Sequence, residues 1–599
     1  MENLPRWDLV PIYPALDSKE LAKGLADLVG FMDRFDRHYA STLARSGPAT
    51  PVQDLARALD DAVTLFNEAY QLSTSMQVYV ESIVSTDSFD TAAAKKLSEL
   101  EILQVRLRQC WTRFQGWIGT IGAVLPKALE KAGPARAHTF ILLETAQQAA
   151  YLMAEKEEML AAELTLSGAN AWSKLQRTLT SQITVDFELD GKVQPLPITS
   201  IVNLRTHPEE KVRRRAYEAE LKVWKGVREP LAACLNGMKG SANTLLTRRG
   251  RKDCLHAPVD GARIDRATLD TLLAAVRDSL PLFRRYFLAK AKRMGKEKLA
   301  WWDLFAPAGA VERTFTWEHT RSLILETFGR FAPSLRALAE RAFDNRWMDA
   351  EPRAGKSGGA FCSPVPSLKE SRILANFDGS LELVSTIAHE LGHAYHNDCA
   401  YRAGKTELQQ MTPMTLAETA SIMCESIVTG ALLERVKDPR EQLAVLETDL
   451  VGASQTVVDI YSRFLFEKEV MERRLASELS ADDLCDIMDR AQAAAYGDAL
   501  DERFRQPYMW TWKPHYYIAG MDFYNFPYTF GLLFATGLYA VSAARGPSFI
   551  GDYEALLAST GEGTAADLAA RFGIDIRSRA FWDGSLDIIR ARIDRYCAL

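Results

Sequence analysis

The 599-residue chain has the composition of an ordinary soluble globular protein, with 47% hydrophobic, 25% charged and 10% aromatic residues. Its plentiful aliphatic and aromatic side chains exclude disorder as the dominant state. The 72 basic and 78 acidic residues give a net charge of −6, which argues against nucleic acid as the main partner, because such proteins carry a basic surplus. Eight cysteines without a Cys-x-x-Cys pair are too sparse for a disulfide scaffold and indicate a reducing compartment.

Apolar residues recur at helical spacing over most of the chain. Long amphipathic helices are predicted over four N-terminal stretches, residues 16–46, 53–86, 90–124 and 136–168. The period changes to two on both sides of an Asp-Gly dipeptide at 190–191, which predicts a β-hairpin over 183–196. Helical patterning resumes near residue 208 and continues to the C-terminus, apart from an extended region at 358–377.

The chain has no long linkers or internal repeats, and the hairpin is the best candidate for a domain boundary. We therefore expect an N-terminal helical domain of residues 1–200 and a second domain of residues 201–599.

One stretch requires a test for membrane insertion. Residues 523–544 carry no charge over 22 positions, which is long enough to cross a bilayer, but they include Asn525 and Pro527 and no comparable second stretch is seen. The N-terminus also lacks a cationic segment followed by an apolar one, so no secretory signal is predicted. We expect a buried helix in a soluble, cytoplasmic protein without a membrane partner.

The sharpest motif is His-Glu-x-x-His, formed by His389, Glu390 and His393 and preceded by Ser380 as a helix cap. Residues four apart project from one face of a helix, so the two imidazoles can bind one tetrahedral ion. Glu390 lies about 100° around the helix, where it can act as general base on the attacking water. The alternative is a pair of surface histidines beside an ordinary glutamate.

A third ligand is needed, and two residues are candidates. His396 lies seven residues after His389, a rise of about 10.5 Å along a helix, which is too far for zinc–nitrogen bonds of about 2.1 Å. We expect it to pack or to form a hydrogen bond nearby. Glu418 follows His393 by 25 residues. It could cap a helix that begins near Thr415, as the second half of a capping box, but the upstream motif favours a ligand.

Glu425 lies two turns beyond Glu418 on the same predicted face. A carboxylate at this position could accept the second ring N–H of a ligand histidine and fix its tautomer. The alternative is a solvated or helix-paired glutamate.

H-E-L-G-H at 389–393 and E-T-A-S-I-M-C-E at 418–425 resemble the oligoendopeptidase F and thimet oligopeptidase group of zinc metallopeptidases. The family's E-x-x-S-x-x-x-E pattern is met by Glu418, Ser421 and Glu425, and the likeness extends over about residues 200–590. The resemblance implies one Zn²⁺ per chain, bound by His389, His393 and Glu418, with Glu390 as catalytic base. It also implies a mainly α, zincin-type fold with a small β-sheet next to the metal helix. The N-terminal helices would form one wall of a deep substrate channel.

Two further segments fit this resemblance. Gly358 and Gly359 precede a short predicted strand, where a peptide backbone could approach closely, although the segment could equally be a mobile surface loop. In the family, such a Gly-rich segment lies beside the substrate.

Residues 508–530 hold ten aromatics in 23 positions, a pattern more often typical of a core. Phenol and imidazole N–H groups can also stabilise an oxyanion. The family places a histidine and tyrosines from this region over the metal, and His515, Tyr524 and Tyr528 match best. Which tyrosine donates is open. We expect Tyr517 to contact substrate.

The predicted function is zinc-dependent hydrolysis of internal peptide bonds in unstructured oligopeptides. A zinc carboxypeptidase or dipeptidase of similar helical fold is the alternative, but no arginine near the metal motif stands out as a carboxylate-binding group. A catalytically silent peptide-binding protein is a further alternative. The presence of His389, Glu390, His393 and Glu418 together argues against it.

Overall fold

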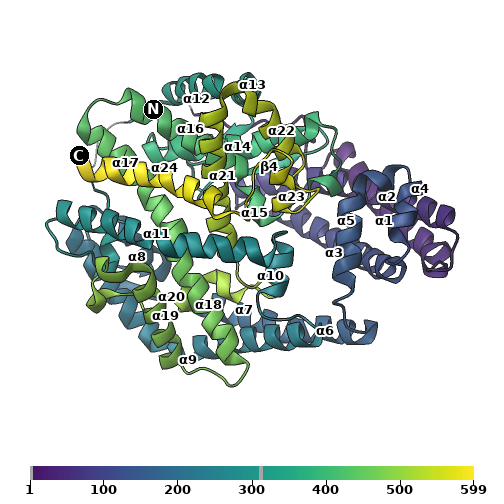
Figure 1. Ribbon diagram of the computed structural model, residues 1–599, viewed down its shortest axis with the longest axis horizontal. Helices are drawn as coiled ribbons and strands as arrows, with labels where there is room; N and C mark the ends of the chain where they lie inside the picture. The colour runs from purple at the N-terminus through teal and green to yellow at the C-terminus, as the bar shows by residue number, and fades with distance from the viewer. Residues whose placement is uncertain (1–3, 309–313) are drawn as a thin grey trace. The chain divides into compact units, whose positions relative to one another are not determined.

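A computed structural model describes residues 4–308 and 314–599 and confirms a mainly α fold with only short strands (Figure 1). Contacts divide the chain into two compact units. The first comprises Met1–Tyr151, Arg313–Ala431 and Val541–Ile574, and the second comprises Leu152–Glu312, Leu432–Ala540 and Asp575–Leu599. This division differs from the predicted boundary near residue 200, because packing between segments far apart in sequence sets it and helical periodicity carries no information on such packing.

The first unit contains these helices and strands: α1 (Lys19–Ser41), α2 (Val52–Thr86), α3 (Thr91–Ile121), α4 (Leu125–Lys131), α5 (Thr139–Ala149), α12 (Trp317–Phe331), α13 (Pro333–Asp344), β3 (Met348–Asp349), β4 (Phe361–Val365), β5 (Glu370–Leu374), α14 (Leu381–Arg402), α15 (Met414–Ala417), most of α16 (Thr419–Arg435), α22 (Phe549–Ala558) and α23 (Ala565–Ala570).

The second unit contains α6 (Glu155–Ser167), α7 (Ala169–Gln182), β1 (Thr184–Leu189), β2 (Lys192–Pro197), α8 (Ile198–Asn203), α9 (Glu210–Arg248), α10 (His256–Gly261), α11 (Arg266–Arg293), α17 (Pro439–Ser454), α18 (Ile460–Arg474), α19 (Ala481–Tyr496), α20 (Met509–Trp512), most of α21 (Phe526–Arg545) and α24 (Arg579–Ala598).

The N-terminal helices of the first unit follow the predicted amphipathic pattern. In α1 the side chains of Leu28, Met32 and Phe35 recur at helical spacing and are buried against α2 and α3. Val365 of β4 and Leu408 belong to the same apolar cluster. The core of the N-terminal helices therefore continues into the part of the chain that carries the metal motif.

The sheet beside the metal helix has the strand order β3-β5-β4. β4 pairs antiparallel with β5, and β3 pairs parallel with it. Both β4 and β5 pack on α14, as the resemblance implies. α14 begins at the predicted cap, since the Ser380 side chain accepts a hydrogen bond from Leu383 N at 3.3 Å.

In the second unit, β1 and β2 form the predicted antiparallel hairpin, with Leu189 opposite Lys192 across the Asp190-Gly191 turn. The long helices α9 and α18 pack together, and α18 packs on α19.

Two helical stretches of the described residues are long and apolar enough to cross a membrane, Phe526–Ala558 and Met414–Arg435. The second corrects our expectation of a single such stretch, which relied on an uninterrupted run without charges. In their most apolar windows 61% and 67% of the residues are buried inside the fold, as in the core helices of a protein.

Candidate metal centre

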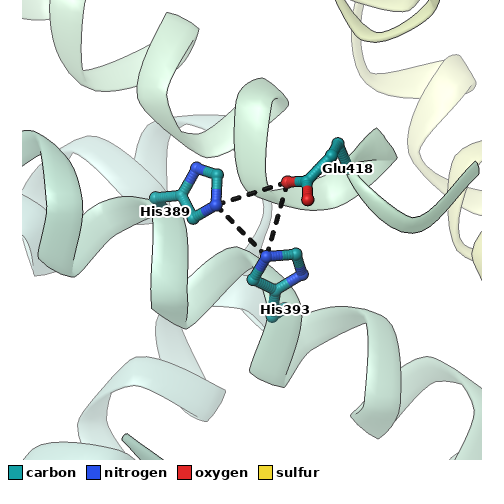
Figure 2. A group of neighbouring side chains, drawn as sticks. All are labelled: His389, His393 and Glu418. Carbon is teal, nitrogen blue, oxygen red and sulfur yellow. Dashed lines mark hydrogen bonds and ion pairs between the residues drawn. The ribbon is translucent and has the colours of Figure 1, made fainter. Parts of the chain in front are cut away.

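Two histidines of α14 form one side of the candidate centre. His389 and His393 lie one turn apart on the same face, and their Nε2 atoms are 3.2 Å from each other (Figure 2). The neighbouring residues Ala388, Leu391 and Gly392 are buried. Because the apolar positions of the helix anchor it in the core, the two half-buried imidazoles project together from one face.

Glu418 forms the third corner, at the junction where α15 ends and α16 begins. Its Oε2 atom lies 3.3 Å from His389 Nε2 and 3.4 Å from His393 Nε2 (Figure 2). Ser421 Oγ donates a hydrogen bond to the same oxygen at 2.6 Å and so orients the carboxylate. Thr415 lies within α15 and does not cap a helix that contains Glu418. This geometry favours the ligand interpretation of Glu418 over the capping box.

The three donor atoms fit a tetrahedral metal ion. Ligands about 2.0–2.1 Å from a zinc ion at tetrahedral angles lie about 3.3 Å from one another. The observed separations of 3.2, 3.3 and 3.4 Å match one face of such a tetrahedron. Within residues 4–308 and 314–599, no other group of three potential ligands lies this close together. The two-nitrogen, one-carboxylate donor set leaves a fourth position for water, as in catalytic zinc sites.

Glu425 makes the contact that its spacing predicts. His389 Nδ1–H donates to Glu425 Oε1 at 2.8 Å. With one proton held on Nδ1, loss of the proton on Nε2 would leave the Nε2 lone pair directed at Glu418 and His393, where the metal would lie.

The charges at the centre favour a cation. Burial alone lowers the pKa of His389, but hydrogen bonds to Glu418 and Glu425 raise it to about 10. Burial and the charge of His389 lower the pKa of His393 to about 4. Burial alone raises the pKa of Glu418, whereas the two imidazoles lower it to about 2. In the metal-free protein a proton on His389 therefore supplies the positive charge that the two carboxylates require.

Glu390, the predicted base, is not one of the three clustered donor residues. Its side chain is buried, the residue being only 5% exposed, and Oε2 has no hydrogen-bond partner among the described residues. Burial raises the pKa of Glu390 to about 7. A buried carboxylate oxygen without a partner is uncommon in folded proteins and marks a place for a water or a substrate group. β4 packs on α14, the helix that carries Glu390.

Gly392, inside the metal-binding motif, allows α14 and α16 to meet. A Cβ atom at this position would lie 2.5 Å from Ser421 Cα and 2.6 Å from the Ala420 carbonyl oxygen. Because α14 and α16 approach each other closely here, Glu418 and Glu425 come within reach of the two histidines of α14. Sequence reasoning missed this role, although a glycine inside a helix, which costs about 1 kcal/mol relative to alanine, is a signal for it.

His396 is not a ligand, as its spacing predicts. Its Nε2 atom forms a hydrogen bond of 2.8 Å with Thr560 Oγ1, and Thr560 in turn bonds Thr412 Oγ1 at 2.7 Å. The residue therefore ties α14 to the segment that leads to Glu418.

His515, Tyr524 and Tyr528 belong to the second unit, where their rings form one cluster. The centroid of His515 lies 5.3 Å from that of Tyr524 and 6.1 Å from that of Tyr528, and the two tyrosine rings are 5.2 Å apart. Burial, with the charges of Arg463 and Lys513, lowers the pKa of His515 to about 4, so the imidazole is neutral near pH 7. The structure thus brings the three predicted donors together, and their action on the oxyanion stays a prediction.

The three predicted substrate contacts belong to different units, Gly358 and Gly359 to the first and Tyr517 to the second. Tyr517 is buried, and its hydroxyl donates to Trp510 O at 3.1 Å, which favours a packing role. Gly358 and Gly359 are exposed, and a Cβ at either would meet nothing within 4 Å. Asn376 Nδ2 donates to Gly359 O at 3.1 Å and holds the loop beside β5. Substrate contact at these three residues stays a prediction.

A family model described as Peptidase family M3 matches residues 203–588. The chain belongs to peptidase family M3. This M3 metallopeptidase is 26% identical to an oligoendopeptidase F homolog of Lactococcus lactis over 451 residues, which cover 74% of each chain. Its fold is similar to the solved structure of a Chlamydophila abortus protein, with a TM-score of 0.83 and 19% identity over 99% of this chain and 98% of that one. A structure of oligoendopeptidase-F from Enterococcus faecium gives a TM-score of 0.65 and 20% identity, covering 96% and 98%.

Proposed function

We propose that this M3 peptidase is a zinc-dependent endopeptidase that cleaves internal bonds of short to medium, unstructured oligopeptides. The observation that carries the proposal is the triangle of His389, His393 and Glu418 with the buried base Glu390 beside it. The oligoendopeptidase F names of its relatives support peptides as substrates. The free cysteines of the described chain are consistent with a cytoplasmic, reducing environment.

Zinc held by the two histidines and Glu418 would polarise the scissile carbonyl and lower the pKa of the attacking water. Glu390 takes a proton from that water and passes it to the nitrogen of the leaving amine. Burial raises the pKa of Glu390 above its ordinary value. A base whose pKa lies nearer to neutral pH can take up and release the proton with little penalty in both transfers. Glu425 keeps His389 in the tautomer that the metal needs.

The aromatic cluster of the second unit is the proposed oxyanion donor. A neutral His515 retains one ring N–H, and Tyr524 and Tyr528 each carry a phenol hydroxyl. Hydrogen bonds to the developing negative charge would lower the barrier to amide hydrolysis. The peptide itself would bind along β4, the outer strand of the sheet order β3-β5-β4, with Gly358 and Gly359 ahead of it.

The dependence on metal tests this function. Removing metal with a chelator should abolish cleavage of a quenched fluorescent peptide, and one equivalent of Zn²⁺ per chain should restore it. Metal analysis of the reloaded protein gives the stoichiometry. Full activity in demonstrably metal-free protein would contradict the proposal.

Zinc affinity should fall with decreasing pH. Below its pKa of about 10, metal-free His389 holds a proton that zinc must displace. The metal-free form therefore gains stability relative to the zinc complex as the pH falls. Between about pH 9 and about pH 8 the Kd for zinc should rise about tenfold. Competition with a fluorescent zinc chelator measures this slope. A Kd that does not change over this interval would show that His389 is not protonated in the metal-free site.

Glu425→Gln should weaken zinc binding by about 10–100-fold. A neutral amide at this position cannot stabilise the Nδ1–H of His389 as a carboxylate does. Glu434→Gln, an exposed position on the same helix, is the control and should leave the affinity unchanged. Equal zinc affinity in the two variants would show that Glu425 does not contribute to zinc binding.

A further inference from the structure

A buried ion-pair cluster ties the turn over residues 518–525 to two helices of the second unit. Lys239 Nζ of α9 lies 2.6 Å from Glu467 Oε1 of α18 and 2.7 Å from Asp522 Oδ1 of the turn. The Lys239 and Glu467 side chains are only 2% and 1% exposed. Buried charges are costly unless they are paired and fully hydrogen-bonded, so such a cluster holds its members in one geometry.

Glu467 accepts hydrogen bonds from the residues on both sides of Tyr524, from the backbone of Phe523 and from the side chain of Asn525. Its Oε1 atom accepts a hydrogen bond from Phe523 N at 3.1 Å, and its Oε2 atom accepts one from Asn525 Nδ2 at 2.7 Å. Phe523 has φ +55°, a left-handed conformation that a bulky residue adopts only when its surroundings fix it. One carboxylate therefore sets the conformation of the turn at the residue before Tyr524 and the residue after it.

The same contacts continue into the first turn of α21. Asn525 Oδ1 accepts a hydrogen bond from Phe526 N at 2.6 Å, and its carbonyl oxygen accepts one from Tyr528 N at 3.0 Å. Asn525 thus starts the helix that carries Tyr528, and Glu467 orients Asn525. The ring contacts among His515, Tyr524 and Tyr528 depend on the position of this turn.

We propose that Lys239 and Glu467 are positioning residues for the proposed oxyanion donors Tyr524 and Tyr528. The inference rests on the proposed function. Lys239 Nζ bonds both Glu467 and Asp522, and its positive charge offsets the repulsion between the two carboxylates. Loss of its charge drives the turn away from α18 and moves both tyrosine hydroxyls. The chemical step should therefore slow, whereas peptide binding should change little.

Lys239→Met tests the inference, because it keeps the length of the side chain and removes its charge. We expect kcat for a fluorescent peptide to fall about 10–100-fold, the range that a misplacement of about 1 Å produces, with little change in KM. The zinc content should stay at one per chain, since the ligands lie in the other unit. In a background that carries Tyr524→Phe and Tyr528→Phe, the same substitution should lower kcat less than about threefold, since the positioned hydroxyls are already gone.

Lys290→Met is the matched control. Lys290 pairs with Glu447 at 2.6 Å, is fully buried in the same unit and donates to Leu304 O, outside the 518–525 turn. We expect it to lower the unfolding temperature as Lys239→Met does and to leave kcat unchanged. If Lys239→Met does not fold, Glu467→Gln and Asp522→Asn, the latter at a more exposed position, replace it as test variants. Each should lower kcat when the tyrosine hydroxyls are present and have little effect when Tyr524→Phe and Tyr528→Phe remove them.

The inference is overturned if Lys290→Met slows cleavage as much as Lys239→Met. It is equally overturned if the Lys239→Met effect is the same with and without the tyrosine hydroxyls. Failure of the proposed function has a different signature, because the zinc-loaded wild-type protein itself would then not cleave peptides.

Discussion

Glu390→Gln should lower kcat for peptide cleavage by about 10²–10⁴-fold, the range that a positioned general base contributes. An amide cannot take a proton from the attacking water at neutral pH. The substitution should leave zinc content and folding intact, because Glu390 is not among the three donor atoms and its Oε2 atom makes no hydrogen bond within the described chain. Steady-state kinetics with a quenched fluorescent peptide, together with metal analysis of the same samples, measures both quantities.

Glu382→Gln is the matched control for this substitution. Glu382 is an exposed residue in the first turn of the same helix, α14, so the same chemical change there should leave kcat unchanged. If Glu390→Gln cleaves at the wild-type rate, the assignment of Glu390 as base is wrong. If it loses zinc, Glu390 contributes to binding the metal rather than to proton transfer.

Gly392→Ala should destabilise the fold and the metal centre together. The added Cβ would lie 2.5 Å from Ser421 Cα and 2.6 Å from Ala420 O, and backbone atoms of a packed helix cannot yield as a flexible side chain does. Overpacking of this kind costs about 1–3 kcal/mol. Separation of α14 from α16 also moves Glu418 and Glu425 away from the histidines. Zinc affinity should therefore fall by at least about tenfold, the effect of losing the hydrogen-bond partner of a metal ligand.

Gly551→Ala is the control for the backbone effect. Gly551 lies in α22 of the same unit, and a Cβ there would meet nothing within 4 Å. Alanine should stabilise this helix by about 0.5–1 kcal/mol and leave zinc binding unchanged. Thermal unfolding with and without zinc compares the two variants. Wild-type stability and zinc affinity in Gly392→Ala would show that the two helices can separate without disturbing the centre.

Features set by local sequence could be predicted. The hairpin at 184–197 follows from alternation around an Asp-Gly turn, and the metal helix follows from its cap at Ser380 and its apolar spacing. The pair His389 and His393 follows from the geometry of one helical turn. The role of Glu418 was harder to predict, because a capping glutamate and a metal ligand share the same local pattern. Only the packing of α16 on α14 distinguishes the two interpretations.

Features that depend on packing between distant segments could not be predicted. The contact of Lys239 with Glu467 and Asp522 joins residues 228 and 283 positions apart, and no local pattern marks it. The same holds for Gly392 against Ser421. The two compact units each draw on three separate segments, and no change of periodicity along the chain marks such a division.

Cleavage of an end-blocked peptide tests the central claim most directly. Zinc-loaded protein is incubated with an unstructured peptide that is acetylated at its N-terminus and amidated at its C-terminus, and mass spectrometry identifies the products. An endopeptidase should cut the blocked peptide at internal bonds and at a rate close to that of its unblocked counterpart. Cleavage of the unblocked peptide alone, by loss of one or two residues from its C-terminus, would contradict the account.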